Sequence, residues 1–265
     1  MKQALTIAGS DSGSGAGLQA DLKTFHAHGV YGLSVVTAVT AQNTVEISTS
    51  EELSADVVSA QLVSVFGDFT VAAVKTGMLA SGVIVDVVAS AIVEYGVDRL
   101  VVDPVLLSKS GYTMLGDDAR GALVEKLLPL AHLVTPNLHE AEQLSGIEIR
   151  GTEDVKVAAE RIHGFGCRNV LIKGGHAEFD RATDIMFDGK TVHEFRGEFI
   201  DTRHTHGIGC TFSAAITARL ALGEPLIEAI DHAKRFVTKA LKSPLEIGRG
   251  QGPVNSLNIQ PPRDD

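Results

Sequence analysis

The sequence has few cysteines, no excess of positive charge and no long apolar run. Its two cysteines, Cys167 and Cys210, give neither a disulfide framework nor the spacing of a zinc site, which fits a reducing compartment. The formal net charge of −10 argues against general nucleic-acid binding. No apolar run reaches the length of a membrane span, and the run Ala4–Ala8 is too short for a signal peptide. We therefore expect a soluble cytoplasmic protein with no nucleic-acid or membrane partner.

The glycine-rich segment from Gly9 to Gly17 lacks the spacing of two common nucleotide-binding motifs. It contains no P-loop pattern, and it has no glycine at the last position of the dinucleotide fingerprint, so neither a P-loop nucleotidase nor a Rossmann dehydrogenase is favoured. The segment is either a flexible turn between a strand and a helix or a close-packed wall over a small ligand. In the second case Asp21, one helical turn further on, would accept hydrogen bonds from an amine or a hydroxyl group of the ligand.

Short apolar runs alternate with longer segments of helical period along the chain of 265 residues, which suits one large domain. The apolar runs are typical of strands buried on both faces: Leu5–Ala8, Ser34–Val39, Ala72–Thr76, Leu100–Asp103, His132–Thr135 and Asn169–Lys173. The expected helices are Leu18–His28, a helix from the cap Ser54 to Phe66, Val83–Tyr95, Asp117–Leu128, a helix from the cap Thr152 to His163, Cys210–Ala221 and Leu226–Leu241.

Two stretches, Val45–Ser50 and Ala182–Phe195, are typical of β-hairpins, and Asp188-Gly189 is a turn signal in the second. The order of the elements predicts an α/β fold with a central, mostly parallel sheet, helices on both faces and small β-hairpin additions. We expect residues 1–265 to form this single domain, with a loose tail from about residue 255 to residue 265.

Polar or glycine-rich groups follow most of the expected strands, at Gly9–Gly17, Lys75–Met78, Asp103-Pro104, Pro136-Asn137 and Lys173–His176. Open parallel sheets bind ligands beyond the carboxyl ends of their strands, so these groups predict one shared cleft. Asp103 either caps a turn or holds a charge for a cation or a proton, and its position beside the cleft favours the second role. Lys173 is either a surface charge or a point charge that pairs with a phosphate.

The segment Asp201–Ile216 passes through Gly207-Ile208-Gly209-Cys210 into a helix of small residues. Glycines before a helix let several free N–H groups point in one direction, and these groups and the helix dipole attract an anion. A cysteine in this position would have its thiolate favoured. The pattern predicts a site for group transfer on a phosphate. The alternative is a glycine-rich turn before a buried helix with a core cysteine.

Asn137 and Glu140 also have two possible roles. Asn137 can cap a helix with Glu140 as its partner three residues on, which is the safer interpretation of this segment alone. The competing role is to hold waters around Mg²⁺, a hard ion that prefers oxygen ligands. His204 and His206 have no third ligand at a recognisable spacing, so zinc is not expected.

Together these segments resemble the hydroxymethylpyrimidine/phosphomethylpyrimidine kinases of thiamine biosynthesis, a group within the ribokinase-like superfamily. The resemblance extends from Ala4 to about Val254. It is carried by Leu5–Gly13, Gly15–Phe25, Thr40–Thr44, Lys75–Met78, Val102–Val105, Lys109–Gly111, Thr135–Asn137 with Glu140, Lys173–His176, and Thr205–Gly207 with Gly209–Thr211.

The resemblance implies an ATP-dependent phosphotransferase, and members of the group are often homodimers. ATP would phosphorylate the primary hydroxyl of 4-amino-5-hydroxymethyl-2-methylpyrimidine and then the monophosphate. It implies that Gly9, Asp21, Gln42 and Met78 form the pyrimidine pocket, that Gly207–Cys210 with Gly209 forms the anion hole, and that Cys210 takes the place of the catalytic Asp of sugar kinases. It places Asn137 and Glu140 near Mg²⁺ and the phosphates of ATP. From their positions at strand ends, we expect Lys173 and Asp103 to bind the cofactor as well.

Some residues depart from the family pattern. His204 replaces an Asn, Ile208 replaces a Thr whose hydroxyl could contact phosphate, and Ser256 stands where the family often has His. Gln42 favours an aminopyrimidine, since a carboxamide matches an edge with a ring nitrogen and an exocyclic amine. Pyridoxal kinases share the Gly-Cys motif, so a pyridoxal or pyridoxine kinase is the first alternative. A non-catalytic ligand-binding protein is the second.

Overall fold

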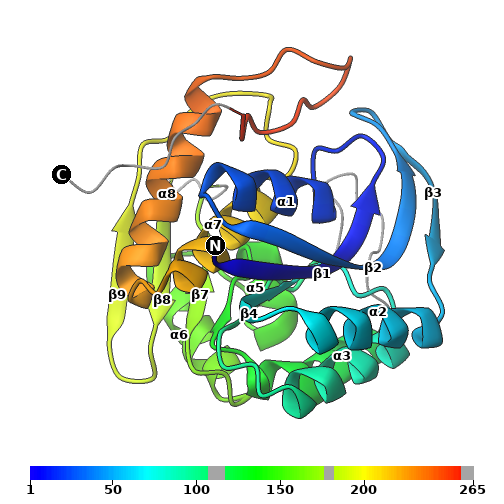
Figure 1. Ribbon diagram of the computed structural model, residues 1–265. Coiled ribbons are helices and arrows are strands. Elements are labelled where there is room, and N and C mark those ends of the chain that lie inside the picture. Colours follow the sequence, from blue (N-terminus) through cyan, green and yellow to red (C-terminus); the bar gives the residue numbers. More distant parts are fainter. Residues whose placement is uncertain (107–116, 176–181, 258–265) are drawn as a thin grey trace.

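Nine strands of the described residues form one sheet at the centre of the protein (Figure 1). The computed structural model describes residues 1–106, 117–175 and 182–257. The strands are β1 (Gln3–Asp11), β2 (Tyr31–Gln42), β3 (Ile47–Glu52), β4 (Val71–Thr76), β5 (Leu100–Val102), β6 (Leu133–Val134), β7 (Val170–Ile172), β8 (Thr183–Phe187) and β9 (Val192–Arg196). Their order is β3-β2-β1-β4-β5-β6-β7-β8-β9. All neighbours from β2 to β7 are parallel, whereas β3, β8 and β9 pair antiparallel at the two ends of the sheet.

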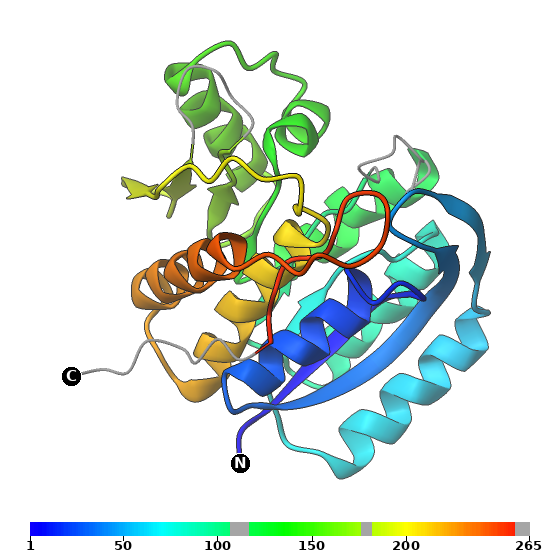
Figure 2. The same ribbon diagram turned by 90° about the horizontal axis from the view of Figure 1, so that it is seen from above.

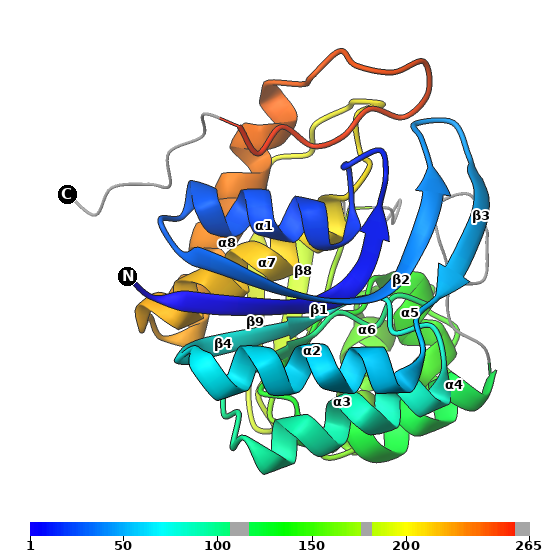
Figure 3. The same ribbon diagram turned by 45° about the vertical axis from the view of Figure 1, so that its right-hand side comes forward.

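Helices cover both faces of the sheet, as Figure 3 shows. One face carries α1 (Gly17–Ala27), α7 (Ile208–Leu222) and α8 (Leu226–Lys242). The other carries α2 (Ala55–Asp68), α3 (Gly82–Glu94), α4 (Asp117–Ala122), α5 (Leu138–Ser145) and α6 (Thr152–His163). Successive residues of β1 face opposite cores: Ala4 packs with α7 and α8, and Leu5 packs with α2 and α3. The predicted architecture is confirmed, and so is the hairpin at Ala182–Phe195. Val45–Ser50 is not a hairpin by itself, because its only strand, β3, pairs with β2.

Three predicted helix boundaries are wrong, and one of them is the start of α7, which lies at Ile208 rather than at Cys210. Thr152 is the first helical residue of α6 rather than its cap, and Gly151 precedes it without a side-chain hydrogen bond. The helix expected at Asp117–Leu128 ends its α-helical part at Ala122, continues as a π-turn over Leu123–Leu127 and closes as a 3₁₀ turn over Leu128–Leu130. Pro129 explains the irregular end, because proline lacks the N–H that a regular helix requires.

The C-terminal segment folds back over the carboxyl edge of the sheet. In Figure 2 it passes, in red, above the start of α7 toward the turn between β2 and β3. The Gln251 amide donates to the Thr44 carbonyl at 2.9 Å. The expectation of a loose tail is wrong for Asn255 and Ser256, because Asn255 donates to the Ser243 carbonyl at 2.7 Å and Ser256 is buried. Residues 258–265 lie outside the described part of the chain.

The parallel strands end together at one edge, where their order reverses. The next strand after β1 in the chain, β2, lies on one side of β1, and the following parallel strands, starting with β4, lie on its other side. The connections after β1 and β4 therefore lead in opposite directions, and a crevice can form between them beyond the ends of these strands. Within the described ranges, no helix combines the length and the apolar character needed to cross a bilayer.

The cap of α2 offers a test of local stability. Ser54 accepts a hydrogen bond from the Val57 amide, as predicted. Ser54→Ala should lower the free energy of unfolding by roughly 0.5–1 kcal/mol, because a helix amide loses its acceptor. Urea denaturation measures the change, with Ser64→Ala on the exposed face of the same helix as the control. Equal effects of the two substitutions would contradict the capping role.

Candidate active site

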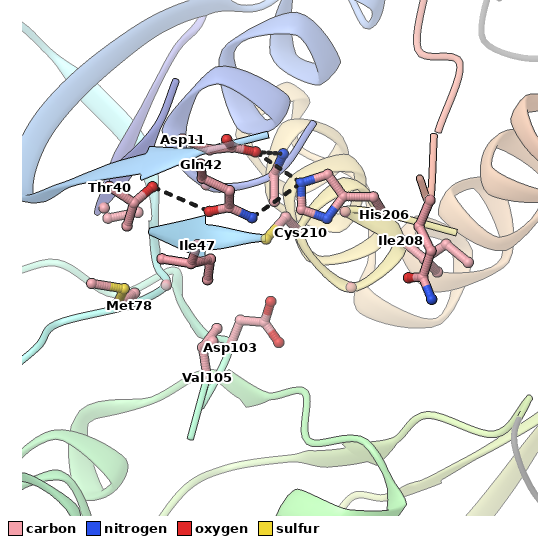
Figure 4. Close-up of a pocket in the computed structure, with 18 of the residues that line it drawn as sticks. Asp11, Thr40, Gln42, Ile47, Met78, Asp103, Val105, His206, Ile208 and Cys210 are labelled. Atoms are coloured by element: carbon pink, nitrogen blue, oxygen red, sulfur yellow. Dashed lines mark hydrogen bonds and ion pairs between the residues drawn. The ribbon is translucent and has the colours of Figure 1, made fainter. Parts of the chain in front are cut away.

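A cavity of about 470 Å³ opens at the carboxyl edge of the sheet, within the size range of small-molecule sites (Figure 4). The predicted shared cleft is therefore present. Residues that the sequence assigned to the site and that line the cavity are Gly9, Gln42, Met78, Asp103, Asn137, Glu140, Lys173, Gly207, Gly209 and Cys210. The structure brings them together from β1, β2, the segments after β4, β5, β6 and β7, and the start of α7.

The start of α7 presents unpaired amides to this cavity. Gly207 precedes the helix in the left-handed conformation, with φ of 80°, and a Cβ there would lie 1.9 Å from the Gly15 carbonyl oxygen. Only glycine fits this turn. The amides of Gly209 and Cys210 have no acceptor among the described residues, whereas the Thr211 amide already donates to the Gly207 carbonyl at 2.8 Å. This turn can therefore offer two N–H groups and the positive end of a helix to an anion.

Lys173 and Asp103 form a buried ion pair below this turn. The Lys173 ammonium donates to Asp103 Oδ1 at 2.7 Å, and Asp103 also accepts from Thr135 and Ser213 at 3.2 and 3.1 Å. Burial would raise the pKa of Asp103, but the charges of Lys173 and Lys75 outweigh it and hold the pKa below its usual range. The sequence left open that Lys173 is a surface charge, and the structure excludes this. The Lys173 Nζ lies next to the turn, because a Cβ added to Gly209 would be 3.3 Å from it. A positive charge thus stands beside the free amides.

The expected direct contact of Asp21 with the ligand is not supported. Asp21 is fully buried and does not line the cavity. Its carboxylate accepts two hydrogen bonds from Lys75, at 2.7 and 2.9 Å, and one from Thr6 at 2.6 Å. Lys75, which the sequence analysis did not assign to the site, lines the cavity instead. Burial opposes the charge of Lys75, but the carboxylates of Asp21 and Asp103 raise its pKa, so the lysine stays an ammonium.

The expectation of a favoured thiolate at Cys210 is wrong. Burial, with smaller contributions from the carboxylates of Asp21 and Asp103, raises the pKa of the Cys210 thiol to about 11. The positive charge of Lys75 and the Gly17 amide lower it, but not enough to compensate. The thiol is therefore neutral near pH 7 in the ligand-free protein. It can orient a hydroxyl group, but it has no charge with which to remove a proton.

Asn137 and Glu140 form the capping box that the sequence predicted for α5. The Glu140 amide donates to Asn137 Oδ1 at 2.9 Å, and the Asn137 amide donates to Glu140 Oε2 at 2.7 Å. Both residues also line the cavity. Burial raises the pKa of Glu140 to about 7, although Lys173 opposes the change. The capping role is confirmed. Because both residues also lie on the cavity wall, the competing role of holding waters around Mg²⁺ stays open to them.

A row of polar side chains lines the opposite wall, in which the sequence analysis had assigned Gln42 but not Asp11, Thr40 or His206. His206 Nε2 lies 2.8 Å from Asp11 Oδ2 and 3.4 Å from Gln42 Nε2, and Thr40 lies 3.1 Å from Gln42 Oε1 (Figure 4). The amides of Gly13, Gly15 and Ala16 converge on the Asp11 carboxylate. An Asp followed directly by closely spaced glycines is a signal that could have identified Asp11. His206 had no such local signal.

The C-terminal segment closes this side of the cavity. Gly250 and Gln251 line it, and the Gly252 carbonyl and the Val254 amide pair with the backbone of His206. His204, one of the departures from the family pattern, is buried beside Gly252. Ile208, another departure, lines the cavity with an apolar side chain. Two parts of the resemblance, Lys109–Gly111 and His176, lie outside the described residues.

Comparison with known proteins places the chain in one class. A family model described as phosphomethylpyrimidine kinase matches residues 11–255. A hydroxymethylpyrimidine/phosphomethylpyrimidine kinase of Rhizobium meliloti is 51% identical over 96% of this chain and 97% of its own. The bifunctional thiamine biosynthesis protein ThiED of Geobacter sulfurreducens is 49% identical over 96% of this chain, which spans 52% of that longer protein. A pyridoxal kinase of Bacillus subtilis, solved with ADP, is 42% identical with a TM-score of 0.90 and 97% coverage of both chains.

The fold is that of a ribokinase-like small-molecule kinase. Within that class, the chain belongs to the phosphomethylpyrimidine kinase family.

Glu140 makes the stability of the protein depend on pH. Its pKa is raised from the ordinary 4.5 to about 7, so the folded state holds this proton more tightly than the unfolded state. That stabilisation is complete below about pH 4.5 and is lost as the pH rises through about 7. Glu140→Gln keeps an acceptor for the capping box. Its free energy of unfolding relative to the wild type should therefore increase by up to about 3 kcal/mol across this range.

Urea denaturation at a series of pH values, without magnesium, measures this difference. Glu153→Gln is the control, because the Glu153 side chain is exposed on α6. A difference between Glu140→Gln and the wild type that does not change with pH would show that Glu140 ionises normally in the folded protein.

Proposed function

We propose that the protein transfers the γ-phosphoryl group of ATP to the primary hydroxyl of 4-amino-5-hydroxymethyl-2-methylpyrimidine, and then phosphorylates the monophosphate to the diphosphate. One observation carries the proposal: the unpaired amides of Gly209 and Cys210 face the same cavity as the Gln42 carboxamide. The free amides can bind the phosphoryl group during its transfer, and the carboxamide can form hydrogen bonds with the edge of an aminopyrimidine ring. The family and the names of the full-length relatives support the same reaction.

The chemistry follows from positioning and charge. In a loose transition state for phosphoryl transfer, negative charge spreads over the oxygens of the transferred group. The Gly207–Cys210 turn would hold those oxygens with its N–H groups, and Lys173 would add a positive charge from below. The neutral Cys210 thiol would orient the substrate hydroxyl. Met78 and Gly9, which touch each other on the wall of the cavity, would hold the ring.

The reaction implies Mg²⁺ with the nucleotide. The side chains of Asn137 and Glu140 offer oxygens, which suit this ion, and a neighbouring cation would favour the ionised form of the buried Glu140. These two residues would hold the ion through its waters, and the ion would neutralise phosphate charge. A homodimer and a cytoplasmic location belong to the same proposal and stay predictions.

Two alternatives have specific grounds. A pyridoxal kinase is supported by the close structural likeness to the Bacillus subtilis enzyme. A non-catalytic binding protein would use the cavity without the transfer step, but the retained Cys210, Asn137 and Glu140 argue against it. We expect ADP release with the pyrimidine to have a higher kcat/KM than with pyridoxal at matched concentrations. A higher value for pyridoxal supports the first alternative. Thermal stabilisation by ligand without any ADP release supports the second.

The role of Cys210 can be measured separately. Cys210→Ala should lower kcat by roughly 10²–10⁴-fold, the range for a positioned group of this kind. The other cysteine, Cys167, is buried in the hydrophobic core and provides the control as Cys167→Ala. Initial rates of ADP release at saturating substrate give kcat for both variants. Near-normal turnover by Cys210→Ala would remove this residue from the mechanism.

A further inference from the structure

Four side chains form a continuous row from Asp11 through His206 and Gln42 to Thr40 (Figure 4). They come from the end of β1, the segment before α7 and the end of β2. All four belong to the wall of the cavity. We can assign which atom donates in each hydrogen bond of this row, because one of its side chains can only accept.

Asp11 is that acceptor. Its carboxylate receives the amides of Gly13, Gly15 and Ala16 at 2.7, 3.0 and 2.9 Å, and its side chain is 4% exposed. Burial works against its charge, but these amides and His206 outweigh burial and lower its pKa. An ionised carboxylate has no proton to donate. The 2.8 Å contact therefore requires the proton to lie on Nε2 of His206.

This proton decides the orientation of Gln42. The end of the carboxamide nearest His206 lies 3.4 Å from a ring N–H, which repels an NH₂ group and attracts an oxygen. Exchanging the nitrogen and oxygen of Gln42 by a half-turn moves no other atom, since the two ends have nearly the same shape. The carboxamide oxygen then faces His206, and the NH₂ group faces Thr40.

Thr40 is consistent with that orientation. Its hydroxyl has one proton and lies 3.0 Å from the Ser10 carbonyl, which can only accept. Once that proton is used, the Thr40 oxygen can accept from the Gln42 NH₂ group at 3.1 Å. Every contact in the row then joins a donor to an acceptor, with the one Nε2–H proton of His206 shared between Asp11 Oδ2 at 2.8 Å and, more weakly, the Gln42 oxygen at 3.4 Å. With the opposite orientation, two donors face each other at His206.

The position of the His206 ring is fixed by its surroundings. Its backbone is paired with Gly252 and Val254 on the C-terminal segment, at 3.1 and 3.0 Å. A Cβ on Gly15 would lie 2.1 Å from the ring, so the ring packs directly on that glycine. The side chain is 16% exposed. Because these contacts hold the His206 ring in place, the proton on its Nε2 determines which end of the Gln42 carboxamide lies next to the ring.

We propose that Asp11 and His206 are positioning residues that orient the Gln42 carboxamide and so set the order of donor and acceptor that a heteroaromatic ring meets in the cavity. Gln42 then offers a lone pair on the His206 side and an N–H on the Thr40 side. An aminopyrimidine fits with its amine toward His206 and its ring nitrogen toward Thr40. The identity of the ring rests on the proposed function, whereas the orientation of Gln42 does not.

The proton on His206 can be observed directly. Long-range ¹H–¹⁵N correlation spectra of the ligand-free protein distinguish the two ring nitrogens, and the His206→Phe spectrum identifies the signals that belong to His206. We expect the proton on Nε2 in the wild type, and Asp11→Asn to increase the share of the tautomer with its proton on Nδ1. A wild-type ring with its proton on Nδ1 alone would overturn the proposal, whatever the substrate is.

Kinetics test the consequence for specificity. The substrates are the 4-aminopyrimidine and the same alcohol without its amino group. His206→Phe should reduce the preference in kcat/KM for the amino compound by about five- to tenfold, the effect of one hydrogen bond, and mainly through KM. Gln42→Ala should cause a similar loss. The double variant should lose no more than Gln42→Ala alone, because both substitutions act through one side chain.

Two controls separate positioning from general damage. His206→Gln retains an N–H for Asp11 and should keep more of the preference than His206→Phe. His193→Phe removes a His–Asp contact of 2.9 Å with Asp188, outside the cavity, and should leave the preference unchanged. Additive losses in the double variant, or an unchanged preference in His206→Phe, would overturn the proposal. If the wild type phosphorylates no pyrimidine, the proposed function fails, and the NMR measurement still decides the orientation of Gln42.

Discussion

The site depends on a buried helix whose first amides have no protein acceptor. From Thr211 to Ala221, α7 is buried on all sides between the sheet and its neighbouring helices. The start of such a helix cannot turn outward to bulk water, and its free N–H groups must be satisfied by something that enters the cavity. Gly207 and Gly15 make this arrangement possible, because their backbones approach more closely than any side chain would allow. An anion is the ligand that best completes the helix.

Charge in the cavity is arranged in neutral pairs. Lys75 is paired with Asp21, and Lys173 is paired with Asp103, so two cations lie within an acidic protein without a large net field. A phosphate that enters meets ammonium groups held in fixed places. Burial, and to a smaller extent the same carboxylates, keeps the Cys210 thiol protonated. Because removing one partner of a buried pair leaves an uncompensated charge, these four residues stabilise the fold as well as the site.

The scaffold alone does not distinguish a pyrimidine from a pyridine substrate. The Bacillus subtilis pyridoxal kinase shares the fold over 97% of both chains. Selectivity must therefore depend on individual side chains that line the cavity. The row from Asp11 to Thr40 is suited to this task, since hydrogen-bond direction changes with one proton while the backbone stays the same. Its members come from three separate parts of the chain, so the row exists only in the folded protein.

Local patterns in the sequence predicted most of the fold. Apolar runs gave the parallel strands, the Asp188-Gly189 turn gave the β8–β9 hairpin, and Asn137 with Glu140 gave the cap of α5. The glycines before Cys210 predicted the open turn at α7. These features depend on residues close in sequence, whose backbone preferences and hydrogen bonds operate over a few positions.

Only the tertiary structure decided which groups meet and which are removed from water. Asp21 pairs with Lys75 across 54 residues, and Asp11 meets His206 across 195 residues. The pKa of Cys210 is raised because burial and distant carboxylates outweigh the helix end that the sequence shows. Desolvation and charge proximity depend on distance in space, and the spacing of residues along a chain carries no record of that distance.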